Sequence, residues 1–312
     1  MPKVCILTSI TDVLKQLSLD RIRKSRKIYV KINMVSAYTL LSMTPPQAIE
    51  ELLHFLRSEM KYTGRIIIAE GSAGGSTADG FRRVGVTNLI DQYDIELFNI
   101  HDDDYYEIPL FDRHFNEIII PISKSLVNAE TLISICRAKT HDTVIVTLTI
   151  KNVAVGGIVG KENRPKIHQG YPAINFNIAI LGAIMFPDIG LIDGRVGMEG
   201  DGPVSGTSKE WGYVFGGENA VEVDAVTAYA MGFDARNIGY LYYLHRLGFG
   251  KIDSLEIVGY KLDDVRTKFV PHSEYNSQLK WRLDKEMEEE ILSRARRIIQ
   301  RYSRRRNIVN NT

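Results

Sequence analysis

Cysteine is scarce in this sequence, and neither sign of charge is in excess. Its 312 residues include two cysteines, Cys5 and Cys136. Two thiols cannot form a disulfide framework, a four-cysteine zinc site or an all-cysteine iron–sulfur cluster, and such scarcity is typical of a reducing compartment. The 39 Lys and Arg residues balance 38 Asp and Glu residues, so the formal charge is +1. A dedicated nucleic-acid-binding protein would carry a strong basic excess, and we therefore do not expect nucleic acid as a partner.

Long uninterrupted hydrophobic segments are also missing. The most apolar stretch, residues 173–192, is interrupted by Asn175, Asn177, Pro187 and Asp188. The turn at Pro187 is expected to split it into a buried helix and a short strand, so we interpret it as core. The apolar start of the chain, residues 1–8, is too short for the hydrophobic region of a signal peptide. We expect a cytoplasmic protein with no membrane association.

The composition is that of a globular protein, with 44% hydrophobic and 25% charged residues. Short runs rich in β-branched residues alternate with segments of helical period, which predicts an α/β fold with a mostly parallel sheet covered by helices. The expected strands are residues 4–8, 28–32, 65–69, 95–99, 117–121, 132–136, 144–148, 189–193 and 255–258. The expected helices are residues 77–83, 171–185, 221–231, 236–247 and a long one near 275–304.

One further helix has a clear start at Thr44-Pro45-Pro46-Gln47. We expect the Thr44 hydroxyl to cap this helix, Pro45 to occupy its first position and Gln47 to complete a capping box. Apolar residues at positions 49, 52, 53 and 56 then form one face of the helix.

The expected organisation is two lobes and a tail. An N-terminal α/β lobe with a glycine-rich loop covers residues 1–125, a second α/β lobe with the Lys, His and acidic motifs covers 126–270, and a basic helix and tail cover 271–312. In the last segment, residues 284–290 are acidic and residues 294–306 contain seven arginines. Acid early and base late suits the helix dipole, so this helix is interpreted as solvated, with a phosphate-rich surface or partner subunit as the alternative.

A glycine-rich loop follows the strand at residues 65–69. It reads Glu-Gly-Ser-Ala-Gly-Gly-Ser at positions 70–76 and precedes a helix. Backbone N–H groups of Gly71, Ser72, Gly74 and Gly75 are expected to approach an anion there. The spacing matches neither the dinucleotide fingerprint nor the P-loop, and a tight turn that only needs glycine conformations is the alternative.

Polar residues cluster in the second lobe. Lys139 and His141 come first, Lys151 and Asn152 follow an apolar stretch, and His168 lies further along. A lysine or histidine among apolar residues is costly to bury unless it faces a cavity or ligand. Lysine can then act as a base or nucleophile, and histidine can transfer protons or bind a metal. These residues therefore predict a functional cleft.

Carboxylates cluster in residues 193–206, where a strand is expected to end. Asp193 and Glu199 stand among several glycines, and Asp224 lies on a helix face that we expect to be buried. Oxygen-rich loops suit a hard cation such as Mg²⁺. The alternative is a structural turn whose acids cap neighbouring helices.

Taken together, these segments resemble the domain of unknown function 362 family. Ordered matches cover roughly residues 28–260, namely Val-Lys-Ile-Asn at 30–33, Lys-Thr-His at 139–141, Lys-Asn at 151–152, His168, Ile-Asp-Gly at 192–194, Met-Glu-Gly-Asp-Gly-Pro at 198–203 with Gly206, and Val-Asp-Ala at 223–225 followed by Met-Gly-Phe at 231–233. Ile32 stands where the family usually has proline. Many relatives carry a ferredoxin module with clustered cysteines, which this sequence lacks, so no iron–sulfur cluster is expected.

A more distant likeness is to the lactate racemase family. His141, Lys151 and His168 are similar to the His, Lys, His run of that family. There the lysine holds a nickel-bearing nicotinate-derived cofactor, one histidine binds the metal and another moves the proton. The resemblance implies that Lys151 contacts a cofactor, His168 is the metal ligand and His141 is the acid or base.

The sequence thus predicts a cleft between the lobes that binds an anionic small molecule or cofactor. Binding is assigned to Lys31, Asn33, Gly71, Ser72, Gly74, Gly75, Lys139 and Asn152, catalysis to His141, Lys151 and His168, and a divalent metal to His168, Asp193 and Glu199. If the protein is an enzyme, we expect metal-assisted acid–base or racemase- or epimerase-like chemistry. The alternative is a non-catalytic cofactor-binding or assembly protein that docks a partner through its Arg-rich helix. The cofactor's identity and assembly into a homo-oligomer stay open.

Overall fold

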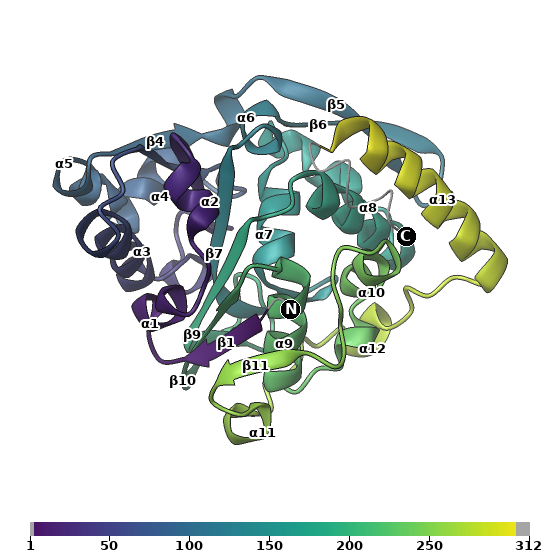
Figure 1. Cartoon of the computed structure of the whole chain (residues 1–312). Helices are drawn as coiled ribbons and strands as arrows, with labels where there is room; N and C mark the ends of the chain where they lie inside the picture. The colour runs from purple at the N-terminus through teal and green to yellow at the C-terminus, as the bar shows by residue number, and fades with distance from the viewer. Residues whose placement is uncertain (1–2, 304–312) are drawn as a thin grey trace.

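The computed structural model describes residues 3–303, which form one large sheet with helices on both faces (Figure 1). The nine strands follow the order β11-β1-β10-β9-β7-β2-β3-β4, with β8 paired to β7. They are β1 (Lys3–Leu7), β2 (Lys27–Lys31), β3 (Arg65–Glu70), β4 (Ile95–Asn99), β7 (Thr131–His141), β8 (Ile145–Thr147), β9 (Ile189–Glu199), β10 (Thr207–Gly217) and β11 (Glu256–Gly259). Most neighbours are parallel, whereas β10 is antiparallel to β1 and β9, and β8 to β7. The predicted α/β fold is confirmed.

Two hydrophobic cores lie between the sheet and its helices, one on each face of the sheet. Ile28 and Val30 of β2 belong to one core and Tyr29, between them, to the other, because successive side chains of a strand point to opposite faces. The first core is covered by α1 (Ile10–Lys15), α2 (Asp20–Lys24), α3 (Pro46–His54), α4 (Thr77–Arg83) and α5 (Ile90–Tyr93). The second is covered by α6 (Lys124–Val127), α7 (Thr149–Gly156), α8 (Tyr171–Ile184), α9 (Ala220–Ala230), α10 (Gly239–Arg246) and α13 (Lys285–Tyr302).

Strands from both expected lobes share the sheet. β2, from the first 125 residues, lies between β3 and β7, and β1 lies between β10 and β11. The position expected to divide the lobes, between residues 125 and 126, falls inside α6, the short helix that precedes β7. A single sheet therefore links the two segments of sequence.

Two strands were not predicted by the sequence pattern. β5 (Tyr105–Phe111) pairs with β6 (Glu117–Ser123) in a separate two-stranded sheet, and β10 pairs along most of β9. β5 contains Glu107 and Pro109 among its apolar residues, and the first half of β10 is polar and exposed. Both strands lie at positions where only part of the chain is buried, so their hydrophobic pattern is weak.

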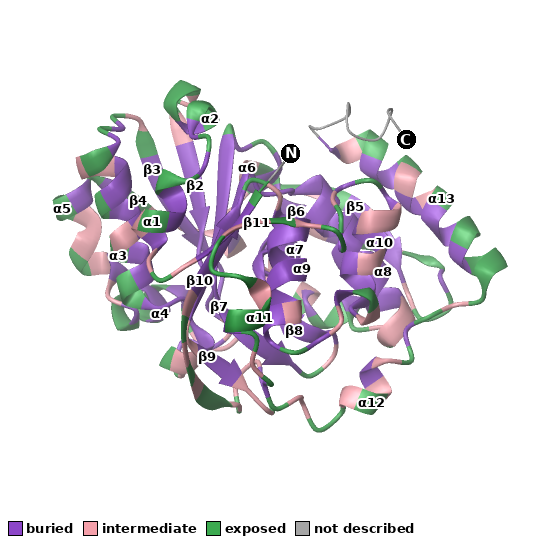
Figure 2. Cartoon of the chain, turned by 60° about the horizontal axis from the view of Figure 1, so that its bottom comes forward, coloured by how far each residue is buried: buried purple, intermediate pink, exposed green. Residues whose placement is uncertain are grey.

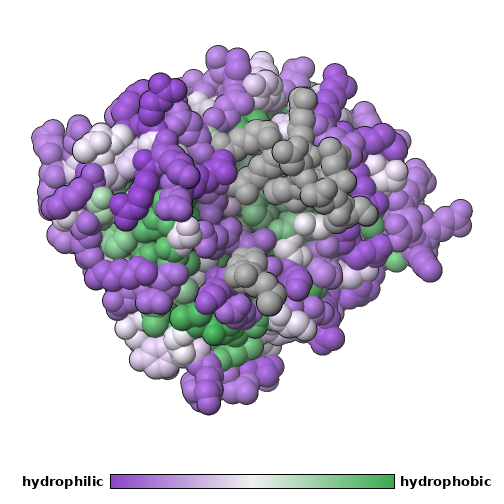
Figure 3. Space-filling view, viewed as in Figure 1, coloured by the Kyte–Doolittle hydropathy of each residue, from purple (hydrophilic) through white to green (hydrophobic). Residues whose placement is uncertain are grey.

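The most apolar stretch of sequence forms the buried helix α8 (Figure 2). Its amides are satisfied inside the protein, since Asn177 pairs with both backbone groups of Phe111 at 2.8 and 2.9 Å, and Asn175 accepts from Tyr240 N at 2.8 Å. Among the described residues, no helix has the length and hydrophobicity needed to span a bilayer. Hydrophilic side chains predominate on the face shown in Figure 3, with hydrophobic ones in smaller patches.

The expected long C-terminal helix is divided in two. A short helix, α12 (Tyr275–Gln278), precedes α13, and Asp284 caps α13 by accepting from Met287 N at 2.9 Å. α13 buries an apolar face that includes Leu292, and Arg294 lies 4.6 Å above the ring of Phe111. Part of the arginine-rich segment, residues 304–306, lies outside the described residues.

The predicted capping box at α3 is wrong. The helix begins at Pro46, its N-cap residue is Pro45, and no side chain caps it. The Thr44 hydroxyl instead donates to Ile135 O at 2.9 Å and accepts from Asn33 N at 2.7 Å. These bonds hold the segment after β2 against β7. The buried groups they satisfy have no access to water, whereas water can bond to the N–H groups of an uncapped helix start.

Candidate ligand-binding site

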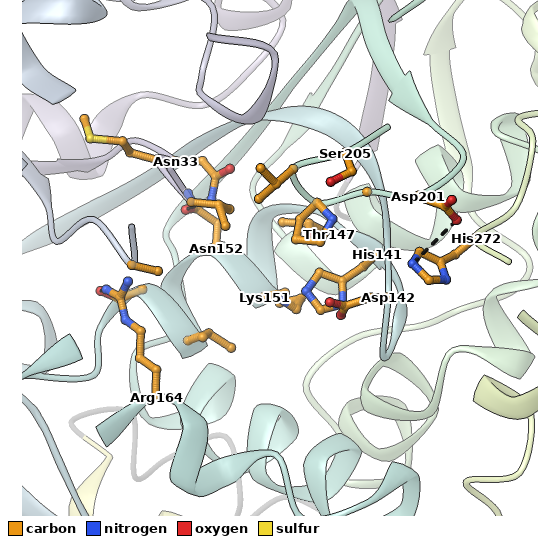
Figure 4. A pocket seen from close by; sticks show the side chains of 18 of the residues that line it. Asn33, His141, Asp142, Thr147, Lys151, Asn152, Arg164, Asp201, Ser205 and His272 are labelled. Carbon is orange, nitrogen blue, oxygen red and sulfur yellow. Dashed lines mark hydrogen bonds and ion pairs between the residues drawn. The ribbon is translucent and has the colours of Figure 1, made fainter. Parts of the chain in front are cut away.

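A cavity of about 580 Å³ opens at the carboxyl ends of β2, β3 and β7 (Figure 4). Lys31 and Glu70 end β2 and β3, and His141 ends β7. The first turn of α7, the segment around residues 164–168, and the loops near residues 201–205 and 272–273 complete the wall. Ligands of open α/β sheets bind at this edge, and the volume suits a small molecule.

A buried network of amides and charges lies under the cavity. Lys31 Nζ donates to Glu70 Oε2 at 2.8 Å, to Ile32 O at 2.7 Å and to Asn152 Oδ1 at 3.3 Å. Asn33 Nδ2 donates to the same Asn152 oxygen at 3.1 Å. Burial lowers the pKa of Lys31, while the Glu70 carboxylate acts against that shift. These hydrogen bonds link β2, β3 and α7 at the base of the cavity.

Lys139 continues this network on the side away from the cavity. Its ammonium donates to Asn33 Oδ1 and to Ser42 O, the latter at 2.7 Å, and its side chain is fully buried. Burial lowers the pKa of Lys139 to about 7. Lys139 does not line the cavity, but it donates to Asn33, which does.

Asp224 of α9 positions the start of α7. Its two carboxylate oxygens accept from the backbone N of Thr149 and of Ile150, each at 2.9 Å. α7 has no capping side chain of its own, so Asp224 satisfies two of the N–H groups that a helix start leaves free. Burial raises the pKa of Asp224 to about 7. We expected Asp224 to lie on a buried helix face, and in the structure it is buried and caps the start of α7.

Lys151 and Arg164 are the two cations of the cavity wall that lack a carboxylate partner among residues 3–303. Lys151 is 6% exposed and makes no hydrogen bond or ion pair with a described residue. Arg164 is 8% exposed, donates one bond to Gly156 O at 3.3 Å, and leaves its buried Nε without a partner. Burial lowers the pKa of Lys151 to about 8, and the Arg164 charge adds to the shift while Asp142 opposes it.

His141 presents its ring to the cavity at the end of β7. Its Nδ1 accepts from Thr143 N at 3.0 Å and lies 3.0 Å from Asp142 Oδ1. Burial and the Lys151 charge lower the pKa of His141 to about 3, so the ring is neutral at pH 7. Because Nδ1 accepts the Thr143 N–H, the neutral ring carries its proton on Nε2 and can donate it to a ligand.

Two further histidines lie nearer the solvent. His168 is exposed at the cavity wall and makes no hydrogen bond with a described residue; partial burial and the Lys151 charge lower its pKa. His272 lies on the opposite side, with Nε2 3.7 Å from Asp201 Oδ1. Figure 4 shows His141 and Lys151 between Arg164 at one end and the His272–Asp201 pair at the other.

The glycine-rich loop contributes less to the cavity than the sequence suggested. Glu70 and Ala73 line it, whereas Gly71, Ser72, Gly74 and Gly75 do not. Ser72 Oγ donates to Gly74 O at 2.7 Å, and Gly74 pairs through its backbone with residues 35 and 37. The loop is held against the segment after β2, and Gly75 permits that close contact, because its φ is +88° and a Cβ there would lie 2.9 Å from Ala37 Cβ.

The structure does not bring together the residues assigned to a metal. Asp193 is paired with Arg195 at 2.7 Å, and Glu199 accepts from Val270 N at 2.9 Å; neither lines the cavity that holds His168. Among the described residues, no three His, Cys, Asp or Glu form a group suited to hold a metal ion.

Several residues of the cavity wall were missed by sequence reasoning. They are Glu70, Asp142, Arg164, Asp201 and His272. Glu70 ends β3 as Lys31 ends β2, so a position at the end of a strand was a usable signal for Glu70. Arg164 and His272 lie in irregular segments, where no periodicity indicates which side chain turns inward.

The fold and site define a class: an α/β protein with a mostly parallel sheet and a polar cavity at the carboxyl ends of its strands. Residues 28–229 match the model of the family described as "Domain of unknown function (DUF362)". The match covers well over half of the chain, and the protein belongs to this family. The matched segment contains Lys31, Lys151 and Arg164, while His272 lies beyond it.

Comparison with individual proteins adds little. No curated protein matched the sequence. Seven solved chains did, among them the lactate racemase apoprotein from Thermoanaerobacterium thermosaccharolyticum, with 13% identity and a TM-score of 0.37. That match covers 61% of this chain and 50% of the racemase chain, so the protein corresponds to about half of that structure's length.

Proposed function

We propose that this protein binds a small molecule bearing a carboxylate or phosphate group in the cavity, with Lys151 and Arg164 as the groups that hold the anion. The observation that carries the proposal is the pair itself: two nearly buried cations of the cavity wall with no carboxylate partner in the described part of the chain. The other deeply buried lysine of the wall, Lys31, has Glu70 at 2.8 Å.

The energetic argument follows from desolvation. Burying a charge without a partner costs several kcal/mol, and proteins commonly avoid that cost by pairing the charge. Lys31 follows this rule, whereas Lys151 and Arg164 do not. A bound anion supplies the missing partner, and charge-assisted hydrogen bonds to it are the strong kind. The lowered pKa of Lys151 has the same cause, because burial disfavours its charged form.

The surrounding groups fit a ligand that undergoes proton transfer. Neutral His141 offers an Nε2–H donor, with Asp142 placed to pair with the ring when a second proton arrives. The ring of His168 makes no hydrogen bond within residues 3–303 and its pKa is lowered, so it is a base at neutral pH. We include acid–base chemistry on the bound anion in the proposal, with His168 as base and His141 as donor.

Calorimetric titration with oxalate and with inorganic phosphate tests the binding proposal. We expect Lys151→Met and Arg164→Met each to weaken the affinity for the better of the two anions by about tenfold or more, since a hydrogen bond to a charged group contributes about 1.5–3 kcal/mol. Lys161→Met is the matched control, because Lys161 is exposed and lies outside the cavity wall. Equal affinities in all four proteins, or no binding of either anion to the wild type, would contradict the proposal.

A further inference from the structure

We infer that Lys151 is a nucleophile that captures an anionic carbonyl compound, such as an oxo acid, as an imine. The inference rests on the proposed function, because the anionic group of that compound occupies the site at Arg164. It adds the ligand's chemical class and a covalent step to reversible anion binding.

Comparison of the three buried lysines selects Lys151. The Lys31 ammonium has three acceptors within 3.3 Å, one of them the Glu70 carboxylate. Lys139 is held by Asn33 Oδ1 and Ser42 O and lies behind the cavity wall. Lys151 has no acceptor among the described residues, and it lines the cavity. Its amine is therefore the one whose lone pair can reach a ligand without first breaking a bond.

The neighbours of Lys151 match the needs of imine formation. Attack requires an unprotonated amine, and burial together with the Arg164 charge brings the lysine pKa to about 8, which leaves an appreciable neutral fraction near pH 7. The charged or titratable groups that act on Lys151, or that its charge acts on, are Asp142, Arg164, His141, His168 and Lys139. Asp142 alone among them favours the ammonium form.

Each part of the wall then has a separate role. Arg164 holds the carboxylate or phosphate at one end of the cavity, and Lys151 lies toward its middle (Figure 4). His141 carries its proton on Nε2 and hydrogen-bonds the carbonyl oxygen, which polarises the carbonyl carbon toward attack.

The step balances without an added reagent. The neutral amine nitrogen attacks the carbonyl carbon, the C–N bond forms, and the carbonyl electron pair moves to oxygen to give a carbinolamine. Loss of the hydroxyl then forms the C=N bond. The two hydrogens of the amine leave with the former carbonyl oxygen as water, and no atom changes its oxidation state overall.

Reductive trapping tests the inference directly. Wild-type protein is incubated with pyruvate, 2-oxoglutarate or dihydroxyacetone phosphate, reduced with borohydride, digested and analysed by peptide mass spectrometry. We expect a secondary-amine adduct at Lys151 with at least one probe, formed faster than any adduct at exposed Lys161. Excess oxalate, which cannot form an imine, should suppress the Lys151 adduct in the wild type by competing for Arg164.

Variants separate this inference from the proposed function. Lys151→Arg keeps the positive charge and removes the nucleophile, so it should bind oxalate and give no adduct in the peptide that contains position 151, whereas Lys161→Arg should behave as the wild type. Oxalate binding without any Lys151 adduct overturns the imine and leaves anion binding standing. An adduct at Lys151 that oxalate does not suppress supports the nucleophile and contradicts the anion site. Labelling of Lys151 no faster than that of Lys161 also overturns the inference.

Discussion

At the scale of single residues, the cavity is explained by which charges are satisfied and which are not. Lys31 donates to Glu70 and Asn152, and Lys139 donates to Asn33 and Ser42 O, so both ammonium groups of this buried network have their hydrogen-bond acceptors inside the protein. Lys151 and Arg164 stand outside that network and face the space where a ligand would lie. A residue kept at a cost in stability is the expected sign of a functional site.

Replacing Lys151 by methionine should therefore stabilise the unliganded protein. We expect the free energy of unfolding of Lys151→Met at pH 7 to exceed that of the wild type by on the order of 1–3 kcal/mol, because the apolar side chain removes the desolvation cost. Urea denaturation at equilibrium measures the difference. A structural lysine would give the opposite sign.

The same comparison has a defined pH dependence. The pKa of Lys151 falls from 10.5 to about 8 on folding, so between these values the unfolded chain binds more protons than the folded one. The stability of the wild type should then rise relative to Lys151→Met as the pH increases from about 8 to about 10.5. A stability difference that stays constant over this window would contradict the assigned burial of an unpaired ammonium.

At this scale, the sequence predicted which residues line the cavity better than it predicted which side chains pair with one another. His141, Lys151, His168, Lys31, Asn33 and Asn152, all expected at the site from their residue types, line one cavity. Asp193 was expected at a metal, but Arg195, two residues away, pairs with it. Pairing between side chains depends on local geometry that no spacing rule records, and for the same reason the role of Arg164 could not be foreseen.

At the scale of elements, α7 decides where Lys151 points. The sequence showed an apolar strand before Lys151 but not the helix that carries it, because α7 is buried on nearly every side and has no amphipathic period. Its start is held from a distance by Asp224 of α9. Local sequence patterns do not record long-range contacts of this kind. By contrast, α4 was predicted with its observed limits; Ser76 caps it, and its buried residues 77, 80 and 81 have helical spacing.

Asp224→Asn tests this positioning. One amide oxygen cannot replace two carboxylate oxygens, so one of the backbone N–H groups of Thr149 and Ile150 loses its partner. We expect the free energy of unfolding to fall by about 1–3 kcal/mol and the affinity for oxalate to fall with it, since α7 carries Lys151. Exposed Asp253→Asn is the control and should change neither quantity. An unchanged affinity with lowered stability would limit Asp224 to a structural role.

At the scale of the whole molecule, one sheet gathers the site from distant parts of the chain. β2 and β3 bring Lys31 and Glu70 from the first part, and β7 and α7 bring His141 and Lys151 from the second. The alternation of strands and helices was enough to predict the class of fold. The order of the strands could not be predicted, because β1 does not pair with β2 or β3, which follow it in the sequence, but lies between β10 and β11.

This topology predicts that the chain unfolds as one unit. Separating the expected lobes near residue 125 would break the pairing of β2 with β7 and of β1 with β10 and β11. Differential scanning calorimetry should therefore show a single transition whose calorimetric and van't Hoff enthalpies agree. Two resolved transitions would indicate that the lobes fold independently and that the sheet divides between β2 and β7.

The central claim is that the cavity keeps an unpaired buried cation because an anion completes it. Thermal unfolding of the wild type and Lys151→Met, each with and without saturating oxalate, tests that claim most directly. Without oxalate the variant should unfold at the higher temperature, and with oxalate the wild type should gain stability while the variant gains little, because only a protein that binds the anion is stabilised by it. A variant that is less stable than the wild type without oxalate, and that gains equally from it, would contradict the account.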